Sequence, residues 1–281
     1  MNDAVTEYMK HKRSLIGEKS ATTLEYRLRG LLRLDERDGL LRTMTAAQAA
    51  DLYTRRVAET KADTHRSELN AAKSFVAWCI KQKWIRANPF AEVEPVGKRS
   101  AGKPQLRVNE ARKFVDTALG EGSNAGLAAA CAVLMGLGPS EVTDRVVRDV
   151  DDDARLWWID FGKTKNRRRH IIIPEALRPR LRQLVKGRAG DAPLWGDVDR
   201  HWLGYHVPRL CKLAGVQRVT PHGLRGLHST LSVKAGIEVE HVARQLGHGG
   251  PTVTRRHYIA PGVEAEAGHE RALTVIEGGR S

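Results

Sequence analysis

A stretch rich in glycine, proline and basic residues divides this sequence into two unequal parts. It reads EPVGKRSAGKPQ over residues 94–105 and lacks the apolar periodicity of the segments on either side. Clusters of glycine and proline mark loops between folded segments rather than elements of a core. We therefore predict a domain over residues 1–95, a basic linker over 96–105 and a larger domain over 106–281.

The part before this boundary is predicted to be wholly helical. Apolar residues recur at helical spacing over residues 20–34 and 62–84, and a further helix is expected over 45–60 with Thr45 as its N-cap. The sequence ANPF at 87–90 then interrupts the pattern, because the residue before a proline disfavours the α conformation.

The part after the boundary is predicted to be helical with one small sheet. Residues 154–174 read ARLWWIDFGKTKNRRRHIIIP, in which two aromatic or β-branched runs flank a polar, basic loop, the pattern of a β-hairpin. Helices are expected over 109–119, 126–137, 139–147, 174–187, 199–214, 222–235, 238–246 and 263–277. The predicted fold class is therefore mainly α with a small β-sheet (α+β).

The charge balance indicates a partner that is itself strongly charged. The 281 residues include 47 Lys and Arg against 33 Asp and Glu, a formal net charge of +14. Many of these cations are arginines, which suit bidentate contact with phosphate. DNA or RNA is the simplest polyanionic partner, and a basic surface without a partner is the alternative.

Cysteine usage and hydropathy predict a cytoplasmic protein that does not enter a membrane. Cys79, Cys131 and Cys211 lie far apart and form no CxxC pair, which is typical of reduced, structural thiols. The first residues, MNDAVTEYMKHKRS, contain no apolar signal-peptide core. The longest apolar run, over residues 125–137, is too short to span a bilayer.

Two stretches concentrate histidine, arginine and tyrosine: TPHGLRGLHSTL at 220–231 and ARQLGHGGPTVTRRHY at 243–258. In the first, His222 and Arg225 lie three residues apart and share one face near the start of a predicted helix. That arrangement suits a phosphate, because the helix dipole adds to the charge of the arginine. In the second, a glycine-rich turn leads to Tyr258 among basic residues.

The same stretches allow two other interpretations. A metal site would use the histidines that lie close in sequence, but no His-x₃-His pair or cysteine partner supports it, and the neighbouring arginine would repel the ion. The histidines concerned are His222, His228, His241, His248 and His257. A purely structural role is the second alternative, with histidines in the core and a tyrosine at the surface.

Taken in order, these motifs resemble the tyrosine recombinases of the phage integrase family. HGLR (222–225) is similar to the family's His-x-x-Arg box, and LGHGGPTVTRRHY (246–258) to its Leu-Gly-His box with the nucleophilic tyrosine about ten residues later. GKTKNRRRHIIIP (162–174) resembles the hairpin that carries the catalytic lysine, and WIRANPF (84–90) resembles the end of the core-binding domain. The resemblance covers nearly the whole chain and implies a helical, SAM-like core-binding domain followed by a catalytic domain with a C-terminal tail.

The resemblance implies a role for each polar residue of the two boxes. Tyr258 would attack a DNA phosphodiester and form a 3′-phosphotyrosine. Arg225 would hold the non-bridging oxygens, with His222 and His248 as hydrogen-bond or proton-transfer partners. The joining of strands reverses this step, so bond energy is conserved, and neither a metal nor another cofactor is implied.

The hairpin would supply the general acid. Lys163 would protonate the leaving 5′-oxygen, and Lys165 is the runner-up because the length of this loop varies. The alternative role for either lysine is a simple contact with phosphate.

One position departs from the family pattern Gly-Leu-Arg-x-Ser-Glu. The chain reads GLGPSE over 136–141, so Gly138 stands where the family has its first catalytic arginine. Arg145 and Arg148 are the nearest candidates for compensation, although their distance along the next helix argues against them. Loss of a preorganised donor typically costs about 10²–10³ in rate, so we expect weakened chemistry beside intact DNA binding. Three explanations compete. The chain is a natural variant that has become a DNA-binding or regulatory protein, an engineered or spontaneous inactive form, or a slow recombinase rescued by another cation.

Contacts with double-stranded DNA are expected from three basic segments, each with a solvated basic face as the alternative. The candidates are Lys61, Thr64, His65, Arg66 and Lys73 in the first domain, Lys98 and Arg99 in the linker, and Lys165, Arg167, Arg168 and Arg169 in the hairpin.

Assembly on a recombination-type DNA site is the expectation that the family resemblance adds. The partners would be further copies of the chain in a homodimer or homotetramer, and accessory DNA-bending proteins. The tail over 262–279, with apolar Leu273, Val275 and Ile276, would pack on a neighbouring protomer or on its own. The setting would be a bacterial cell or its nucleoid, or a phage genome.

Three functions follow from these features. The first is site-specific strand exchange by Tyr258, attenuated by Gly138. The second is a structural or regulatory role for a catalytically inactive, integrase-like protein bound at recombination-type sites. The third is a topoisomerase-like relaxation of DNA, since the same chemistry rejoins the original strand.

Overall fold

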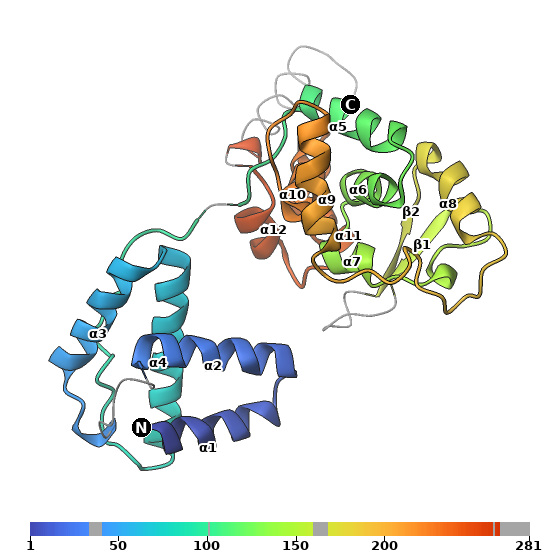
Figure 1. Cartoon of the computed structure of the whole chain (residues 1–281). Coiled ribbons are helices and arrows are strands. Elements are labelled where there is room, and N and C mark those ends of the chain that lie inside the picture. Colours follow the sequence, from blue (N-terminus) through green and yellow to red (C-terminus); the bar gives the residue numbers. More distant parts are fainter. Residues whose placement is uncertain (34–40, 101, 160–167, 261, 265–281) are drawn as a thin grey trace. The chain divides into compact units, whose positions relative to one another are not determined.

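A computed structural model of the chain describes residues 1–33, 41–100, 102–159, 168–260 and 262–264 (Figure 1). Its contacts divide into two units, Met1–Ser100 and Ala101–Ser281, and each has its own hydrophobic core. Helices dominate both units, and one antiparallel pair of strands lies in the second. The predicted class, mainly α with a small sheet, is confirmed.

In the described residues of the first unit, four α-helices form a bundle. They are α1 (Asn2–Arg13), α2 (Glu18–Leu32), α3 (Ala46–Glu59) and α4 (Ala62–Lys81), with a short 3₁₀ turn over Leu41–Thr43. α2 and α4 pack against each other, and α1 and α3 pack against both. Leu28, Leu31 and Phe75 are fully buried between them, because apolar residues recur on one face of each helix.

A local sequence signal explains where α3 begins. The Thr45 hydroxyl accepts the N–H of Gln48 at 3.2 Å, and the Gln48 side chain accepts the N–H of Thr45 at 3.0 Å, which confirms the predicted N-cap. α1 was not predicted, although Val5, Tyr8 and Met9 have helical spacing and are buried.

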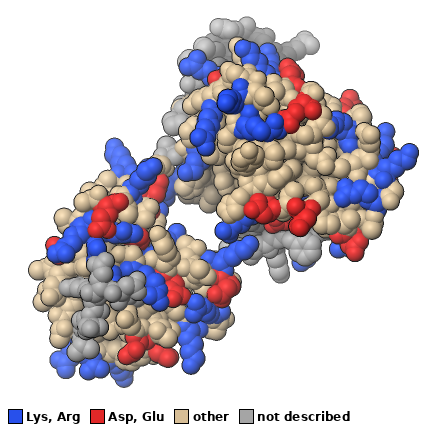
Figure 2. Space-filling view, in the orientation of Figure 1, with Lys and Arg blue, Asp and Glu red and all other residues tan. Residues whose placement is uncertain are grey.

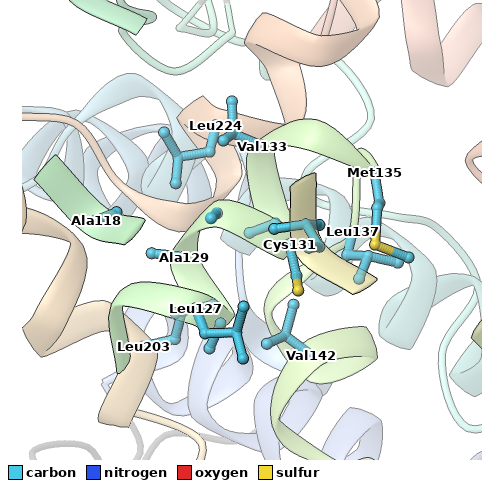
Figure 3. Packing of buried hydrophobic residues seen from close by; sticks show 14 of the residues in the cluster. Ala118, Leu127, Ala129, Cys131, Val133, Met135, Leu137, Val142, Leu203 and Leu224 are labelled. Atoms are coloured by element: carbon cyan, nitrogen blue, oxygen red, sulfur yellow. The ribbon is translucent and has the colours of Figure 1, made fainter. Parts of the chain in front are cut away.

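The second unit is built around α6 (Asn124–Leu134). This alanine-rich helix is buried on nearly every side by α5 (Val108–Gly120), α9 (Trp202–Leu213) and α10 (Pro221–Lys234) (Figure 1). Small side chains let the neighbouring helices approach closely: a Cβ on Gly126 would lie 2.0 Å from the carbonyl oxygen of Ala118. Figure 3 shows Leu127 and Cys131 of α6 gathered with Val142 and Leu203 in this core.

The predicted hairpin is present. Strands β1 (Leu156–Ile159) and β2 (Arg169–Ile172) pair antiparallel, with Trp157 opposite Ile171 and Ile159 opposite Arg169. Trp157, Ile159 and Ile171 are buried against the core, whereas Trp158, His170 and Ile172 are exposed. The inward and outward faces thus alternate along each strand, as the pleat requires.

Several helices differ from their predicted extents. The helix expected over 139–147 is only α7 (Pro139–Thr143), followed by a 3₁₀ turn over Val147–Asp149. The segment 174–187 starts with a 3₁₀ turn (Glu175–Leu177) before α8 (Arg178–Val185). The remaining helices are α11 (Val239–Gln245) and α12 (Pro251–His257). No helix was predicted for α12, because the sequence analysis gave only a glycine-rich turn before Tyr258. The helix predicted over 263–277 lies almost wholly outside the described residues.

Within the described part of the chain, no helix combines the length and the apolar character needed to cross a bilayer.

Candidate functional site

The turn between α6 and α7 contains two glycines with different roles. Gly136 has φ +65°, and a Cβ there would lie 2.5 Å from Cδ2 of His228, so this position requires glycine. Gly138 has φ −72° and ψ 160°, an extended conformation open to any residue. A Cβ on Gly138 would meet Oε2 of Glu141 at 3.4 Å and Nη1 of Arg225 at 3.5 Å, which are ordinary contacts. The turn therefore depends on Gly136, whereas the backbone at position 138 would accept a side chain.

The carboxylate of Glu141 connects this turn to two arginines. Its Oε2 accepts the N–H of Gly138 at 2.9 Å and also Nη1 of Arg225. Its Oε1 accepts Nη1 of Arg169 at 3.0 Å. Burial alone would raise the pKa of Glu141, but the charges of both arginines, helped by the N–H of Gly138, lower it to about 2. The carboxylate is therefore ionised at neutral pH.

Arg225 occupies the centre of the site and is only 5% exposed. It lies in the second turn of α10, which begins at Pro221 and is capped by the Thr220 hydroxyl accepting the N–H of Gly223 at 3.2 Å. Its Nη1 donates to the carbonyl of Gly136 at 2.8 Å and its Nη2 to that of Leu246. Burial lowers the pKa of Arg225, while the charge of Glu141 opposes that shift.

His248 and Tyr258 lie against this guanidinium. Nε2 of His248 is 3.3 Å from Nη2 of Arg225, which can only donate, so Nε2 accepts and Nδ1–H donates to the Thr254 hydroxyl at 2.7 Å. The rings of His248 and Tyr258 have centroids 5.0 Å apart. The guanidinium carbon of Arg225 lies 5.5 Å from the centroid of the Tyr258 ring.

Backbone contacts hold Tyr258 at the end of α12. Its carbonyl oxygen accepts the Gln105 amide at 3.0 Å and the Thr230 hydroxyl at 3.2 Å. Its hydroxyl oxygen lies 3.5 Å from Nδ1 of His222. Desolvation, followed by the charges of Arg225 and Lys103, lowers the pKa of His222 below its usual 6.5. A neutral imidazole therefore faces the tyrosine hydroxyl at neutral pH.

The structure thus brings together His222, Arg225, His248, Tyr258 and the backbone of Gly138. The predicted lysines, Lys163 and Lys165, and the neighbouring Arg167 lie outside the described residues. Among the described residues, no three His, Cys, Asp or Glu side chains are placed to hold a metal ion.

The sequence interpretation missed two residues of this group, Glu141 and Arg169. No role was predicted for Glu141, which is the last residue of the motif GLGPSE at 136–141. Arg169 was predicted to contact the DNA backbone, yet its side chain is 11% exposed and bound to Glu141. The alternation of side chains along a strand could have indicated this position, because Arg169 lies two residues before buried Ile171 and therefore on the same face of the strand. Arg168 is exposed and stays a candidate for DNA contact.

The predicted DNA contacts of the first unit, other than His65, fall into two groups. Lys61, Thr64 and Lys98 are exposed. The others are engaged within the unit: Arg66 donates to the carbonyl of Pro95 at 2.9 Å, Lys73 to that of Ala91 at 3.0 Å, and Arg99 to the Ser67 hydroxyl at 3.2 Å. These contacts fasten the segment after α4 to the helix itself.

His65 corrects one of the predicted DNA contacts. It is 3% exposed, and its Nδ1 lies 2.9 Å from the Tyr53 hydroxyl, which also accepts the N–H of Val96 at 3.1 Å. Burial lowers the pKa of His65. A side chain held inside the bundle has no surface to offer to DNA, so His65 is a structural residue.

Lys and Arg side chains are spread over the visible face of both units, with fewer Asp and Glu among them (Figure 2).

The sequence model of the phage integrase family matches residues 104–264, more than half of the chain, and includes the group around Arg225 from Gly136 to Tyr258. The chain belongs to the phage integrase family. Its members are tyrosine-type DNA strand transferases that bind and recombine DNA, so the resemblance seen in the motifs is confirmed.

Individual relatives cover most of the chain. It is 26% identical over 258 residues to the tyrosine recombinase XerC of Mycobacterium sp. (strain KMS), covering 83% of this chain and 81% of the relative. The fold is similar to that of the Tn1549 transposon integrase in complex with transposon right end DNA, with a TM-score of 0.78, 20% identity and coverage of 96% and 98%. A lambda integrase tetramer bound to a Holliday junction gives a TM-score of 0.72 at 19% identity, covering 90% of this chain and 75% of that one.

Proposed function

We propose that this protein is a site-specific DNA recombinase that cleaves one strand through Tyr258. The observation that carries the proposal is that the Tyr258 hydroxyl lies 3.5 Å from Nδ1 of a neutral imidazole, His222, while the buried guanidinium of Arg225 lies 5.5 Å from the centroid of the Tyr258 ring. Family membership alone does not assign these roles; the proposal is supported by the proximity of a phenol hydroxyl, an unprotonated imidazole and a guanidinium, which are suited to act as nucleophile, base and anion-binding group.

The cleavage step uses each of these groups. The hydroxyl of Tyr258 loses its proton to Nδ1 of His222, and its oxygen attacks the phosphorus. The bond from phosphorus to the 5′-oxygen breaks, and the electron pair leaves with that oxygen, which takes a proton from Lys163 or Lys165. The products are a 3′-phosphotyrosine and a free 5′-hydroxyl, and attack by the 5′-hydroxyl of another strand reverses the step.

Arg225 supplies the charge that stabilises the pentacoordinate phosphorus. Its guanidinium is fixed by the carbonyls of Gly136 and Leu246 and by Glu141, so it reorients little when the phosphate arrives. His248 orients the guanidinium from the other side, and Thr254 holds its ring in the tautomer that accepts from Arg225.

DNA would be held by both parts of the chain. We assign residues 1–95 to a core-binding domain, 96–105 to a linker and 106–281 to the catalytic domain. Among the described candidates, Lys61, Thr64, Lys98 and Arg168 are exposed and open to the DNA backbone. The solved lambda integrase is a tetramer on a Holliday junction, which supports a homodimer or homotetramer assembled on DNA, with accessory DNA-bending proteins as further partners.

The alternative is an integrase-like protein that binds recombination-type sites without cutting them. Gly138 favours this alternative, because it supplies no side chain where the family pattern has an arginine. The two functions share the DNA-binding step and differ only in the covalent step.

One experiment separates the two functions. A duplex recovered from a random pool by binding to the full-length Tyr258→Phe protein is nicked to make a suicide substrate. The native protein is expected to form a covalent adduct that the Tyr258→Phe protein does not form. Tight, salt-sensitive binding without an adduct would establish the non-cleaving function instead.

A further inference from the structure

The charge balance around Arg225 depends on more than Arg225 itself. Its Nη1 is bound to ionised Glu141, and a guanidinium paired with a carboxylate has no net charge. With Gly138 in place of an arginine, this pair alone would present a neutral surface to a DNA phosphate. A site that stabilises developing negative charge needs a further cation.

Arg169 is placed to provide it. It starts strand β2 opposite Ile159, and its side chain turns inward on the same face as Ile171. Its Nη1 binds Oε1 of Glu141 at 3.0 Å, while Arg225 binds Oε2, so one carboxylate joins two guanidinium groups. The three side chains together carry a net charge of +1. They are each between 6% and 11% exposed, where water screens their charges little.

A side chain at position 138 would start next to the same carboxylate, that of Glu141. A Cβ on Gly138 would lie 3.4 Å from Oε2 of Glu141, so an arginine side chain there would start beside this ion cluster. The arginines that follow in sequence do not take its place. Arg145 is buried in a pair with Asp149 at 3.3 Å, and Arg148 is exposed with its Cβ against Gly190.

The geometry points to Arg169 as the residue that replaces the positive charge missing at Gly138. Arg169 neutralises the carboxylate of Glu141, so the positive charge of Arg225 is left for the scissile phosphate. This inference rests on the proposed strand cleavage. Arg169 acts through Glu141 and Arg225, so it is a positioning residue. The two neighbouring arginines therefore have different functions: exposed Arg168 is free to contact DNA, whereas Arg169 binds Glu141 in the site.

The first test varies the charge of the phosphate itself. The nicked duplex is prepared with either a phosphodiester or a neutral methylphosphonate at the scissile position. Arg169→Ala is expected to slow Tyr258-dependent cleavage of the phosphodiester by about 10²-fold and to slow cleavage of the methylphosphonate far less. An equal loss on both substrates would mean that Arg169 only maintains the fold, and the inference would be wrong.

Second variants separate charge from structure. Arg169→Lys is expected to retain most of the activity, and Glu141→Gln in the Arg169→Ala protein is expected to restore part of it, because the uncompensated carboxylate is removed. Arg168→Ala is the matched control, expected to weaken DNA binding without changing the ratio between the two substrates. Failure of both rescues would overturn the role of Glu141 as the link.

The missing arginine gives a further test. Gly138→Arg is expected to accelerate cleavage much more in the Arg169→Ala protein than in the native protein, because the two cations serve the same purpose. Such non-additivity is expected of residues that share partners. Equal gains in both backgrounds would show that Arg169 does not stand in for position 138.

A binding measurement tests the role of Arg169 even for a protein that does not cleave DNA. The Tyr258→Phe protein is titrated with selected duplexes carrying one methylphosphonate at successive positions. It is expected to bind less tightly when the scissile position is neutral, and the additional Arg169→Ala substitution is expected to abolish that preference. An unchanged preference would overturn the inference, whereas the absence of an adduct with native protein would overturn only the proposed cleavage.

Discussion

Nδ1 of His222 lies 3.5 Å from the hydroxyl oxygen of Tyr258, and the environment of this imidazole keeps it unprotonated at neutral pH. Desolvation disfavours the imidazolium, and the charges of Arg225 and Lys103 disfavour it further. A base needs its lone pair free, so these two cations keep His222 ready to accept a proton.

The first prediction concerns the pH dependence of cleavage. Because the pKa of His222 is lowered below 6.5, the rate of adduct formation should stay level as the pH falls through 6.5 and decline only at lower pH. His222→Ala should reduce the rate by about 10²-fold and remove this acidic limb. Exposed His241→Ala is the control. An acidic limb that persists in His222→Ala would assign the base to another group.

The second prediction compares the two glycines of the turn after α6. Gly136→Ala should destabilise the protein by about 1–3 kcal/mol, because its positive φ is strained for alanine and its methyl group would collide with His228. Gly138→Ala should be neutral or slightly stabilising, by up to about 1 kcal/mol, because its backbone is extended and its Cβ fits. Urea unfolding of both variants tests the pair, and equal losses would contradict this distinction.

The third prediction concerns the buried pair Tyr53 and His65 in the first unit. Tyr53→Phe removes the partner of Nδ1 of His65 and the acceptor for the N–H of Val96. Leaving buried groups unsatisfied should lower the free energy of unfolding by about 1–3 kcal/mol. Hydrogen exchange at Val96 should quicken at the same time. Tyr26→Phe, at an exposed tyrosine, is the control, and a comparable effect there would refute the assignment.

Much of the candidate site was predictable because its residues lie close together in the sequence. His222 and Arg225 share a helical face three residues apart, and the helix that carries them starts within one residue of its predicted position. Family motifs then identified Tyr258 and His248. These features depend on local spacing, which a sequence displays directly.

The contribution of Arg169 depends on long-range geometry. It meets Glu141 across 28 positions of sequence, and only the register of the hairpin decides that Arg169, and not its exposed neighbour Arg168, turns inward. The requirement for glycine at Gly136 was not predicted: its backbone is left-handed, and His228 of a distant helix fills the space that a side chain would need. Neither fact is visible without the packing of α10 and β2 against the turn.

The last prediction uses the ion pairs of Glu141 as a source of stability that depends on pH. A carboxyl with a pKa of about 2 in the folded protein, against about 4.5 when unfolded, stabilises the folded state above pH 4.5 by about 3 kcal/mol. That contribution is lost as the pH falls from 4.5 toward 2, because the unfolded chain then takes up the proton more readily. Glu141→Gln should therefore be less stable than the native protein at pH 7.

Urea unfolding at pH 7 and at pH 3 measures this difference. The gap between the native protein and Glu141→Gln should narrow at pH 3, where the native carboxylate has lost part of its advantage. Glu92→Gln, at an exposed position, provides the control and should differ little from the native protein at either pH. A gap for Glu141→Gln that stays constant between the two pH values would show that its pairing with Arg169 and Arg225 does not stabilise the fold, because only the ionised carboxylate forms those pairs.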